Sequence, residues 1–193
     1  MRDSLIAWSG GVESTALVVW ALNKGYNPLI YHVNNSWHLD SIETERKGVL
    51  EMKKILGCEV LDLENKSHGQ FRFMSEKPKT MLNFYWWMYW GVFLSCTNPG
   101  LHVLWYGDNN GVFKEGDGLG DAQTQQFEDV KQGSIRVARG LQNSFDVQCP
   151  LRRPKVELWN SIPDELKPHV HSSDDHEAWV KFYDREKSKT NSI

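Results

Sequence analysis

The fold is decided by one stretch near the start of the sequence, Leu5-Ile6-Ala7-Trp8-Ser9-Gly10-Gly11-Val12-Glu13-Ser14. Its apolar part, residues 5–8, predicts a buried strand, and residues 14–24 predict a helix that Gly25 terminates. The two glycines between them allow a tight turn and a close approach of the backbone to an anion. The N–H groups and the positive dipole end of the helix favour a phosphate there, and two serine hydroxyls add donors. We therefore predict a phosphate-binding loop at residues 9–14.

The spacing of this loop separates it from two common phosphate-binding motifs. The sequence has no Gly-x-x-x-x-Gly-Lys-Ser/Thr at this position, as in a Walker loop, and no Gly-x-Gly-x-x-Gly, as in a dinucleotide-binding fingerprint. The remaining alternative is a plain strand–turn–helix junction that needs glycine for its turn. The position directly after a first strand favours phosphate binding over that alternative.

The rest of the chain continues the alternation of strands and helices. Short apolar runs predict further strands at residues 29–33, 59–63, 101–106 and 145–149. Helices are predicted at residues 40–56, which open with a capping box, at residues 81–96 and near residues 122–139. This alternation predicts an α/β fold with a five-stranded parallel sheet flanked by helices. We expect a single domain over residues 1–193, in which residues 150–193 form a helical appendage.

Composition and charge exclude several classes of protein. The formal net charge of −3 gives no overall attraction for nucleic acid or an anionic membrane, so we expect neither as a partner. The three cysteines form no Cys-x-x-Cys pair, which favours a reducing compartment, with Cys58 and Cys96 as core residues. Residues 81–96 are shorter than the roughly 20 that a membrane span needs, and no signal segment is recognised. We expect a soluble, cytoplasmic protein.

The phosphate loop resembles that of a known superfamily. Ser-Gly-Gly-x-Asp-Ser after a first strand is the loop of the ATP pyrophosphatases, which include GMP synthetase, asparagine synthetase, tRNA thiolation enzymes and 7-cyano-7-deazaguanine synthase. This sequence is similar to that motif, with Glu13 in place of the aspartate. The resemblance implies an adenine nucleotide α-hydrolase-like, Rossmann-like fold that binds ATP. It also implies that the protein releases pyrophosphate when it adenylates a carbonyl oxygen, so that a nucleophile can displace AMP.

Three further segments resemble 7-cyano-7-deazaguanine synthase. They are residues 31–35 (Tyr-His-Val-Asn-Asn), residues 106–110 (Tyr-Gly-Asp-Asn-Asn) and residues 149–159 (Cys-Pro-Leu-Arg-Arg-Pro-Lys-Val-Glu-Leu-Trp). The resemblance implies an ATP- and Mg²⁺-dependent ligase that uses ammonia. Its small-molecule substrate would be a base similar to 7-carboxy-7-deazaguanine, whose carboxyl or amide group becomes a nitrile.

Two departures from that family keep other functions open. The family has a four-cysteine zinc site, but the matching residues 170–176 contain no cysteine, so we expect no structural zinc and solvated histidines there. The family's Tyr-Pro-Asp-Cys-Arg-Pro-Glu-Phe segment is replaced by residues 116–127. The alternatives are therefore an enzyme that adenylates a different carboxylate or modified base, and a nucleotide-binding protein without catalysis.

Two residues are candidates for catalysis. Asp108 follows the fourth strand at its carboxyl end, where open parallel sheets bind ligands, and it is the best-placed carboxylate for Mg²⁺. Lys155 can place its charge near the β/γ phosphates of ATP, and the equally favoured interpretation is a lysine on the protein surface without a role in binding. Its neighbours Arg152 and Arg153 are either a pyrophosphate clamp or a solvated pair. We expect Asp117 and Asp121 in a surface loop.

The nucleotide-binding candidates are the loop and the ends of strands: Ser9, Gly10, Gly11, Val12, Glu13, Ser14, His32, Val33 and Gly107. The resemblance places the backbone of His32 and Val33 at the adenine, and we prefer a half-buried strand histidine to a catalytic base. The aromatic helix at residues 81–96 is apolar around most of its surface, so we expect it to be buried on several sides. A core helix or a homodimer interface is favoured over base stacking on these rings.

Overall fold

The computed structural model describes residues 2–34, 39–64, 76–98, 100–107 and 119–171. Within these ranges strands and helices alternate along the chain. The strands are β1 (Leu5–Ala7), β2 (Leu29–Asn34), β3 (Val60–Glu64), β4 (Val103–Trp105) and β5 (Asp146–Gln148). The helices are α1 (Val12–Asn23), α2 (Leu39–Leu56), α3 (Glu76–Thr97), α4 (Leu119–Gly140), α5 (Lys155–Ser161) and the short 3₁₀ helix η1 (Lys167–His169).

The strands form a five-stranded sheet in the order β3-β2-β1-β4-β5, and every pairing is parallel. Strand β1 lies in the middle, where Leu5 is paired with Leu29 of β2 on one side and Leu104 of β4 on the other. This confirms the predicted α/β fold, and the alternation and strand order are consistent with a Rossmann-like fold.

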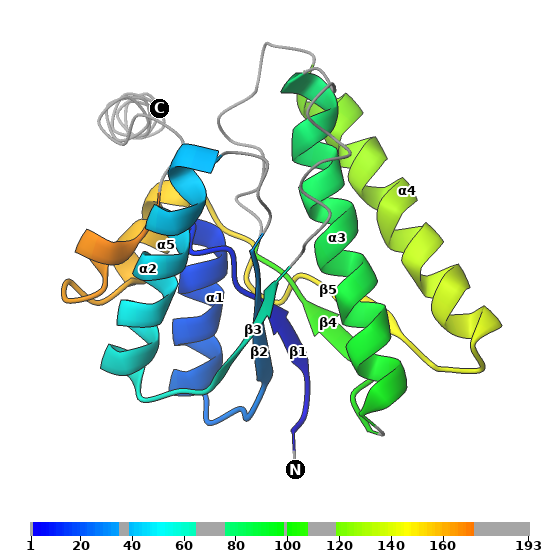
Figure 1. Cartoon of the computed structure of the whole chain (residues 1–193), viewed down its shortest axis with the longest axis horizontal. Coiled ribbons are helices and arrows are strands. Elements are labelled where there is room, and N and C mark those ends of the chain that lie inside the picture. Colours follow the sequence, from blue (N-terminus) through cyan, green and yellow to red (C-terminus); the bar gives the residue numbers. More distant parts are fainter. Residues whose placement is uncertain (1, 35–38, 65–75, 99, 108–118, 172–193) are drawn as a thin grey trace, which may run out of the picture.

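Helices cover both faces of the sheet (Figure 1). Successive side chains of a strand point to opposite faces, so Ile6 and Trp8 enter one hydrophobic core, while Leu5 and Ala7 enter the other. The first core contains residues of α1, α2 and α5, and the second contains residues of α3 and α4. The sheet is therefore the middle layer of three, as in other parallel α/β proteins.

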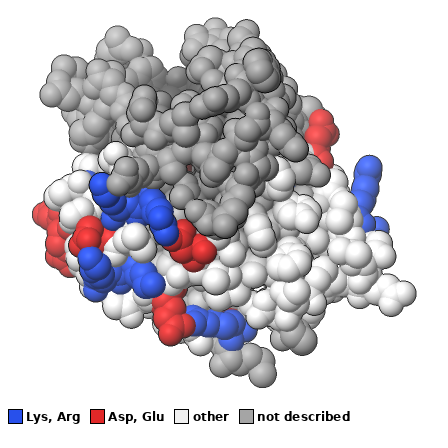
Figure 2. Space-filling model, in the orientation of Figure 1, with Lys and Arg blue, Asp and Glu red and all other residues white. Residues whose placement is uncertain are grey.

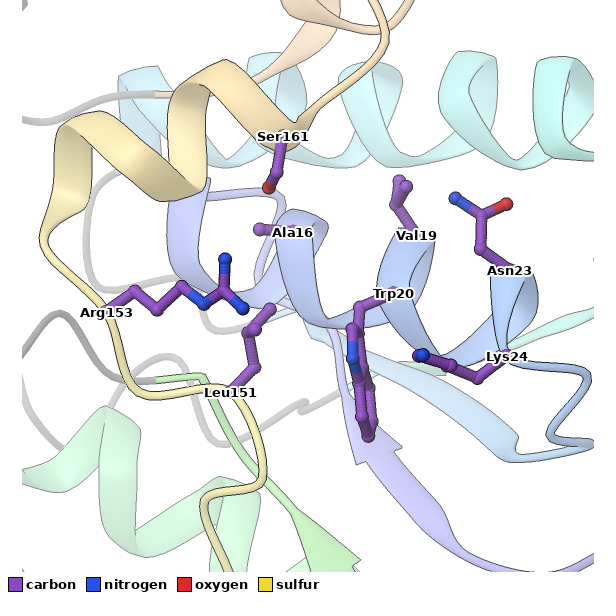
Figure 3. Close-up of a pocket in the computed structure, with 8 residues that line it drawn as sticks. All are labelled: Ala16, Val19, Trp20, Asn23, Lys24, Leu151, Arg153 and Ser161. Atoms are coloured by element: carbon purple, nitrogen blue, oxygen red, sulfur yellow. The ribbon is translucent and has the colours of Figure 1, made fainter.

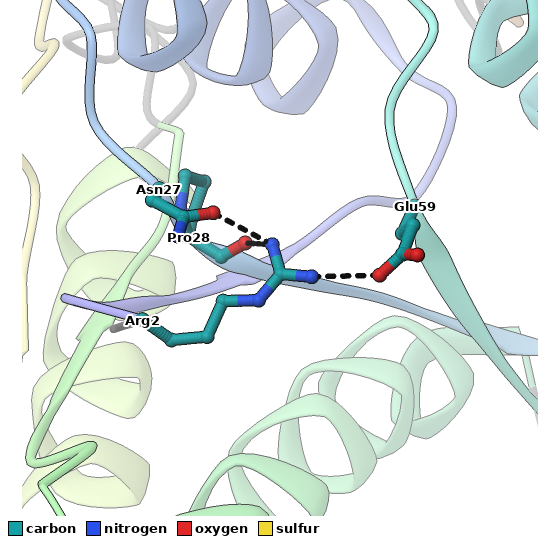
Figure 4. Close-up of polar contacts among 4 residues, drawn as sticks. All are labelled: Arg2, Asn27, Pro28 and Glu59. Carbon is teal, nitrogen blue, oxygen red and sulfur yellow. Dashed lines mark hydrogen bonds and ion pairs between the residues drawn. The ribbon is translucent and has the colours of Figure 1, made fainter.

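The N-terminal edge of the sheet is tied together by one side chain. Arg2 donates to Asn27 Oδ1 at 2.9 Å, to the Pro28 carbonyl at 2.8 Å and to Glu59 Oε2 at 2.8 Å (Figure 4). The segment before β1 is thereby linked to the starts of β2 and β3. Because Glu59 is 87% exposed, the ion pair itself contributes little, and the hydrogen bond to the half-covered carbonyl matters more.

Several element boundaries differ from the sequence prediction. Helix α1 starts at Val12 rather than at Ser14, because Gly11 already serves as its N-cap. Helix α3 starts at Glu76 rather than at residue 81, and its proline stands in the first turn, where the missing N–H has no helical partner to lose. Helix α4 starts at Leu119, so Asp121 lies on a helix and not in a loop.

The described part of the aromatic helix α3 packs against both the sheet and α4, and it leaves one side exposed. Met88 and Val92 are buried against the sheet, whereas Tyr89 and Phe93 are each 47% exposed. Figure 2 shows an uncharged area over the lower half of α3, while charged side chains gather over α2. The expected burial is therefore found on the sides that face the sheet and α4, but not at Tyr89 and Phe93. None of the helices in the described ranges is long and apolar enough to cross a bilayer.

The predicted core positions of the cysteines are half correct. Cys58 is partly buried and packs against the first core, where burial raises the pKa of its thiol. Cys96 is exposed, contrary to the prediction, because it lies on the outer side of α3 beside Phe93 rather than on the Met88 side.

Candidate functional site

The predicted phosphate loop lies at the point where the strand order reverses. From β1 the sheet continues to β2 and β3 on one side and to β4 and β5 on the other. Ligands of open parallel sheets bind in the crevice beyond the carboxyl ends of the strands at such a point. The segments that leave β1 and β4 at this edge are residues 8–11 and residues 106–107. The topology thus places the loop where a ligand is expected.

Buried hydrogen bonds hold the end of β1 and the start of α1 in one geometry. The Trp8 indole donates to Thr15 Oγ1 at 2.9 Å in the core, and the Trp8 amide donates to the Tyr31 carbonyl at 2.8 Å. Between them Gly10 adopts a φ of +86°, which side chains disfavour, and a Cβ there would lie 3.0 Å from Val49 Cγ2. The turn therefore requires glycine at this position.

The two serine hydroxyls of the loop bond to each other. Ser9 Oγ lies 2.8 Å from Ser14 Oγ, which also accepts from the Ser9 amide at 3.2 Å. The Gly11 amide donates to Ser9 Oγ at 3.2 Å, which closes a small ring of hydrogen bonds. These hydrogen bonds fix the positions of both hydroxyl groups next to the first turn of α1. Among the described residues no side chain caps that helix, and its first internal bond runs from the Thr15 amide to the Gly11 carbonyl.

Gly107 brings the end of β4 into direct contact with the first turn of α1. A Cβ at this position would collide with the Glu13 carbonyl oxygen and would lie 2.5 Å from its carbonyl carbon and 2.9 Å from the Ser14 amide nitrogen. These are backbone atoms, which cannot rotate away. Gly107 and the loop are therefore neighbours, and this close approach leaves no room for a side chain at position 107.

Lys155 reaches the loop from the other side. It is the first residue of α5, is only 5% exposed, and its Nζ lies 3.6 Å from Glu13 Oε1. The interpretation as a surface lysine is therefore wrong. Glu13 extends toward this ammonium group, so the loop carries a buried cation at the side of its helix N-terminus. Helix α5 packs along α1, which places the lysine.

His32 and Val33 lie on β2 beside the loop, with both side chains buried. His32 Nδ1 lies 2.8 Å from the Trp8 carbonyl, which can only accept, so Nδ1 carries the proton. Burial lowers the pKa of His32, and the imidazole is neutral at neutral pH. The sequence predicted a half-buried histidine, but the His32 ring is almost fully buried. Its hydrogen bond to the Trp8 carbonyl holds the backbone at the end of β1.

One part of the site was missed by the sequence analysis. The His171 amide donates to the Gly10 carbonyl at 2.8 Å, and His171 Nε2 lies 3.3 Å from Glu45 Oε1 of α2. The segment reaches this place because α2 has Gly48 in its middle, where any Cβ would collide with the His169 carbonyl oxygen. A glycine inside a predicted helix was the available signal, since it often marks a close backbone approach.

Other predicted residues are not brought together. Asp108 and Asp117 lie outside the described residues. Arg152 and Arg153 are both exposed, and Arg153 lines a pocket on the outer side of α1 rather than the loop. Within the described ranges, no group of three His, Cys, Asp or Glu side chains is arranged to hold a metal ion.

The fold and the loop define the class of this chain as a parallel α/β protein with a glycine-containing loop at the switch point of its sheet. Comparison of the sequence with protein-family models and with curated proteins finds no match. Any narrower assignment therefore depends on the chemistry of the site.

Proposed function

We propose that the chain is an ATP-dependent ligase that forms AMP and pyrophosphate, similar in reaction to 7-cyano-7-deazaguanine synthase. The observation that carries the proposal is the convergence of a Ser-Gly-Gly loop, a helix N-terminus and the buried Lys155 at the switch point of the sheet. Each of these groups favours negative charge, and together they suit a polyphosphate.

The residues of the loop would act on the leaving group. As the bond to the α-phosphorus breaks, negative charge builds up on the pyrophosphate, and donors that are already oriented stabilise that charge without reorganising. Ser9 and Ser14 would exchange their mutual bond for bonds to phosphate oxygens. Lys155 would supply a point charge, with Glu13 as the group that positions it.

Bound Mg²⁺ would supply further neutralisation of the pyrophosphate. It usually takes one or two carboxylates plus phosphate oxygens, and Glu13 is the described carboxylate on the loop. Its ion pair with Lys155 makes a water-mediated contact a better fit than direct ligation. Asp108, the other candidate, lies outside the described residues.

The proposed reaction begins with a carboxylate of the acceptor. Its oxygen attacks the α-phosphorus, the bond to pyrophosphate breaks, and the carboxyl group becomes an adenylate. Ammonia then attacks the carbonyl carbon, AMP leaves with the oxygen, and one proton is released to give an amide. The amide oxygen would then attack the α-phosphorus of a second ATP and release pyrophosphate, and loss of AMP and of both protons of the amide nitrogen gives the nitrile.

The test is a product analysis with the purified chain. ATP, Mg²⁺, ammonium and 7-carboxy-7-deazaguanine are incubated together, and AMP and pyrophosphate are quantified. We expect acceptor-dependent AMP, and a loss of at least about 100-fold in Lys155→Met, which removes a charge aimed at the leaving group. Lys54→Met is the matched control, because Lys54 is an exposed residue of α2 whose partner is Glu51.

The outcomes separate the proposal from its alternatives. Formation of ADP and phosphate, or full AMP formation in Lys155→Met, would refute the proposed chemistry. AMP with another carboxylate or modified base, but not with the deazaguanine, would indicate a different acceptor, as the replaced segment at residues 116–127 suggests. ATP binding with no AMP from any acceptor would identify a nucleotide-binding protein. Unchanged ATP affinity in a Ser9→Ala, Ser14→Ala double variant would remove the loop from the site.

A further inference from the structure

A cavity lies away from the phosphate loop, on the outer side of α1. Its volume is about 330 Å³, and it is bounded by one face of α1, the segment that follows β5 and the end of α5 (Figure 3). None of residues 9–14 lines it. The volume is at the lower end of the range for small-molecule sites, which is roughly 300–1,000 Å³.

The inner wall of this cavity is apolar and rigid. Val19 and Leu151 are core residues whose outer atoms reach the cavity, and Trp20 adds an indole ring. That ring is held in place by Tyr26 and Trp105, whose ring centroids lie 5.6 and 5.8 Å from it. An aromatic ring with a fixed orientation is a preformed surface for the apolar part of a ligand.

The charges at the cavity are all of one sign. Arg153 and Lys24 line it, and no acidic residue is among its described lining residues. In Figure 3 the two side chains point inward from opposite sides, Arg153 toward Ala16 and Lys24 toward Trp20. Among the described residues neither charged group has an ion-pair or hydrogen-bond partner. Both side chains are exposed and able to reorient, so either can approach an anion that enters the cavity, and no carboxylate among the described lining residues competes with it.

We propose that this cavity is a binding site for a small organic acid, with a carboxylate between Arg153 and Lys24 and an apolar body against Trp20 and Leu151. The planar guanidinium of Arg153 matches a carboxylate with two parallel hydrogen bonds, and Lys24 adds a mobile point charge. The Asn23 side chain at the same rim offers an amide for further polar groups of the ligand. This site does not depend on the ATP-binding proposal, since it shares no residue with the loop.

The test uses the full chain and a probe pair that differs only in charge. Binding of 2-naphthoate and of neutral 2-naphthamide is measured by calorimetry and by saturation-transfer NMR, with acetate as an anion without an apolar body. We expect 2-naphthoate to bind with a dissociation constant below about 1 mM, and the amide and acetate to bind at least about 10-fold more weakly. Such a pattern requires both the cations and the apolar wall.

Variants locate the site on the molecule. Arg153→Met and Lys24→Met should each weaken 2-naphthoate binding at least about 10-fold, because each removes a charge-assisted contact. Arg152→Met is the matched control, since this neighbouring arginine is exposed and does not line the cavity. A Ser9→Ala, Ser14→Ala variant should also bind 2-naphthoate normally, whatever it does to ATP. Equal binding of acid and amide, or unchanged binding in the Arg153 and Lys24 variants, would overturn the proposal.

Discussion

Gly107→Ala adds one methyl group where the end of β4 touches the first turn of α1. The new Cβ would lie 2.5 Å from the Glu13 carbonyl carbon and 2.9 Å from the Ser14 amide nitrogen. Carbon atoms in good contact are about 3.5–4.0 Å apart, so the two segments must separate by about 1 Å. The backbone of Gly107 lies outside the left-handed region, so the alanine would be strained by this collision alone.

The expected cost follows from that displacement. Overpacking of a tightly packed contact destabilises by roughly 1–3 kcal/mol. In a chain of this length 1 kcal/mol shifts the melting temperature by about 2–4 °C, so a cost near 2 kcal/mol lowers it by about 4–8 °C. The displaced turn carries the loop amides and the Ser14 hydroxyl, and we expect ATP affinity to fall at least about 10-fold as well.

Thermal unfolding by circular dichroism and ATP binding by calorimetry measure both effects. Gly133→Ala in α4 is the control with the same chemical change, because apart from the neighbouring backbone of its own helix no described atom lies within 4 Å of its added Cβ. Alanine is the better helix former, so Gly133→Ala should raise the melting temperature by about 1–4 °C and leave ATP binding unchanged. If Gly107→Ala melts and binds ATP like the wild type, the contact between β4 and the loop is not as described.

Three other predictions concern different parts of the molecule. Because burial lowers the pKa of His32, its imidazole is protonated in the unfolded chain before it is protonated in the folded chain, as the pH falls below about 6.5. The free energy of unfolding should then drop by up to about 1.4 kcal/mol per pH unit. Urea titrations at several pH values should show this dependence in the wild type and a flatter one in His32→Asn. In the same urea assay, Arg2→Met should lower the free energy of unfolding by about 1 kcal/mol, and Glu59→Gln should lower it by under about 0.5 kcal/mol. The reason is that the hydrogen bond from Arg2 to the Pro28 carbonyl contributes more than the exposed ion pair with Glu59, and equal losses would contradict this. If the exposed aromatic side of α3 forms a homodimer interface, light scattering should give the mass of a dimer for the wild type and of a monomer for the Tyr89→Lys, Phe93→Lys double variant. A monomeric wild type at the same concentration would exclude this interface.

Most of the fold could be predicted from local sequence patterns. The apolar run in residues 5–8, the glycines after it and the alternating strands and helices predict the parallel sheet, because each signal lies within one element. Element starts were less accurate: α3 begins at Glu76 because a proline is tolerated in a first turn, which the hydrophobic pattern does not reveal. The exposure of Tyr89 was missed because composition does not tell which side of an apolar helix faces the sheet.

The site was predictable only where it is continuous in sequence. The loop at residues 9–14 was located from its own glycines and serines, and its place at the switch point follows from the fold. The approach of Lys155 to Glu13 and of His171 to Gly10 joins segments far apart in the chain. Such contacts depend on how α5 and the following turn pack on α1 and α2, and no periodicity encodes that packing.

The central place of β1 has a consequence for biosynthesis. On one edge Leu5 pairs with Leu29, but on the other edge its partner Leu104 is made roughly 100 residues later. At a synthesis rate of about 5–20 residues per second, the β4 side of β1 stays without its partner strand for roughly 5–20 s. An unpaired parallel edge is a template for wrong pairing, so the nascent chain should be most prone to aggregation in this interval. Ribosome-bound fragments that end before β4 should accordingly bind chaperones more than fragments that include β5.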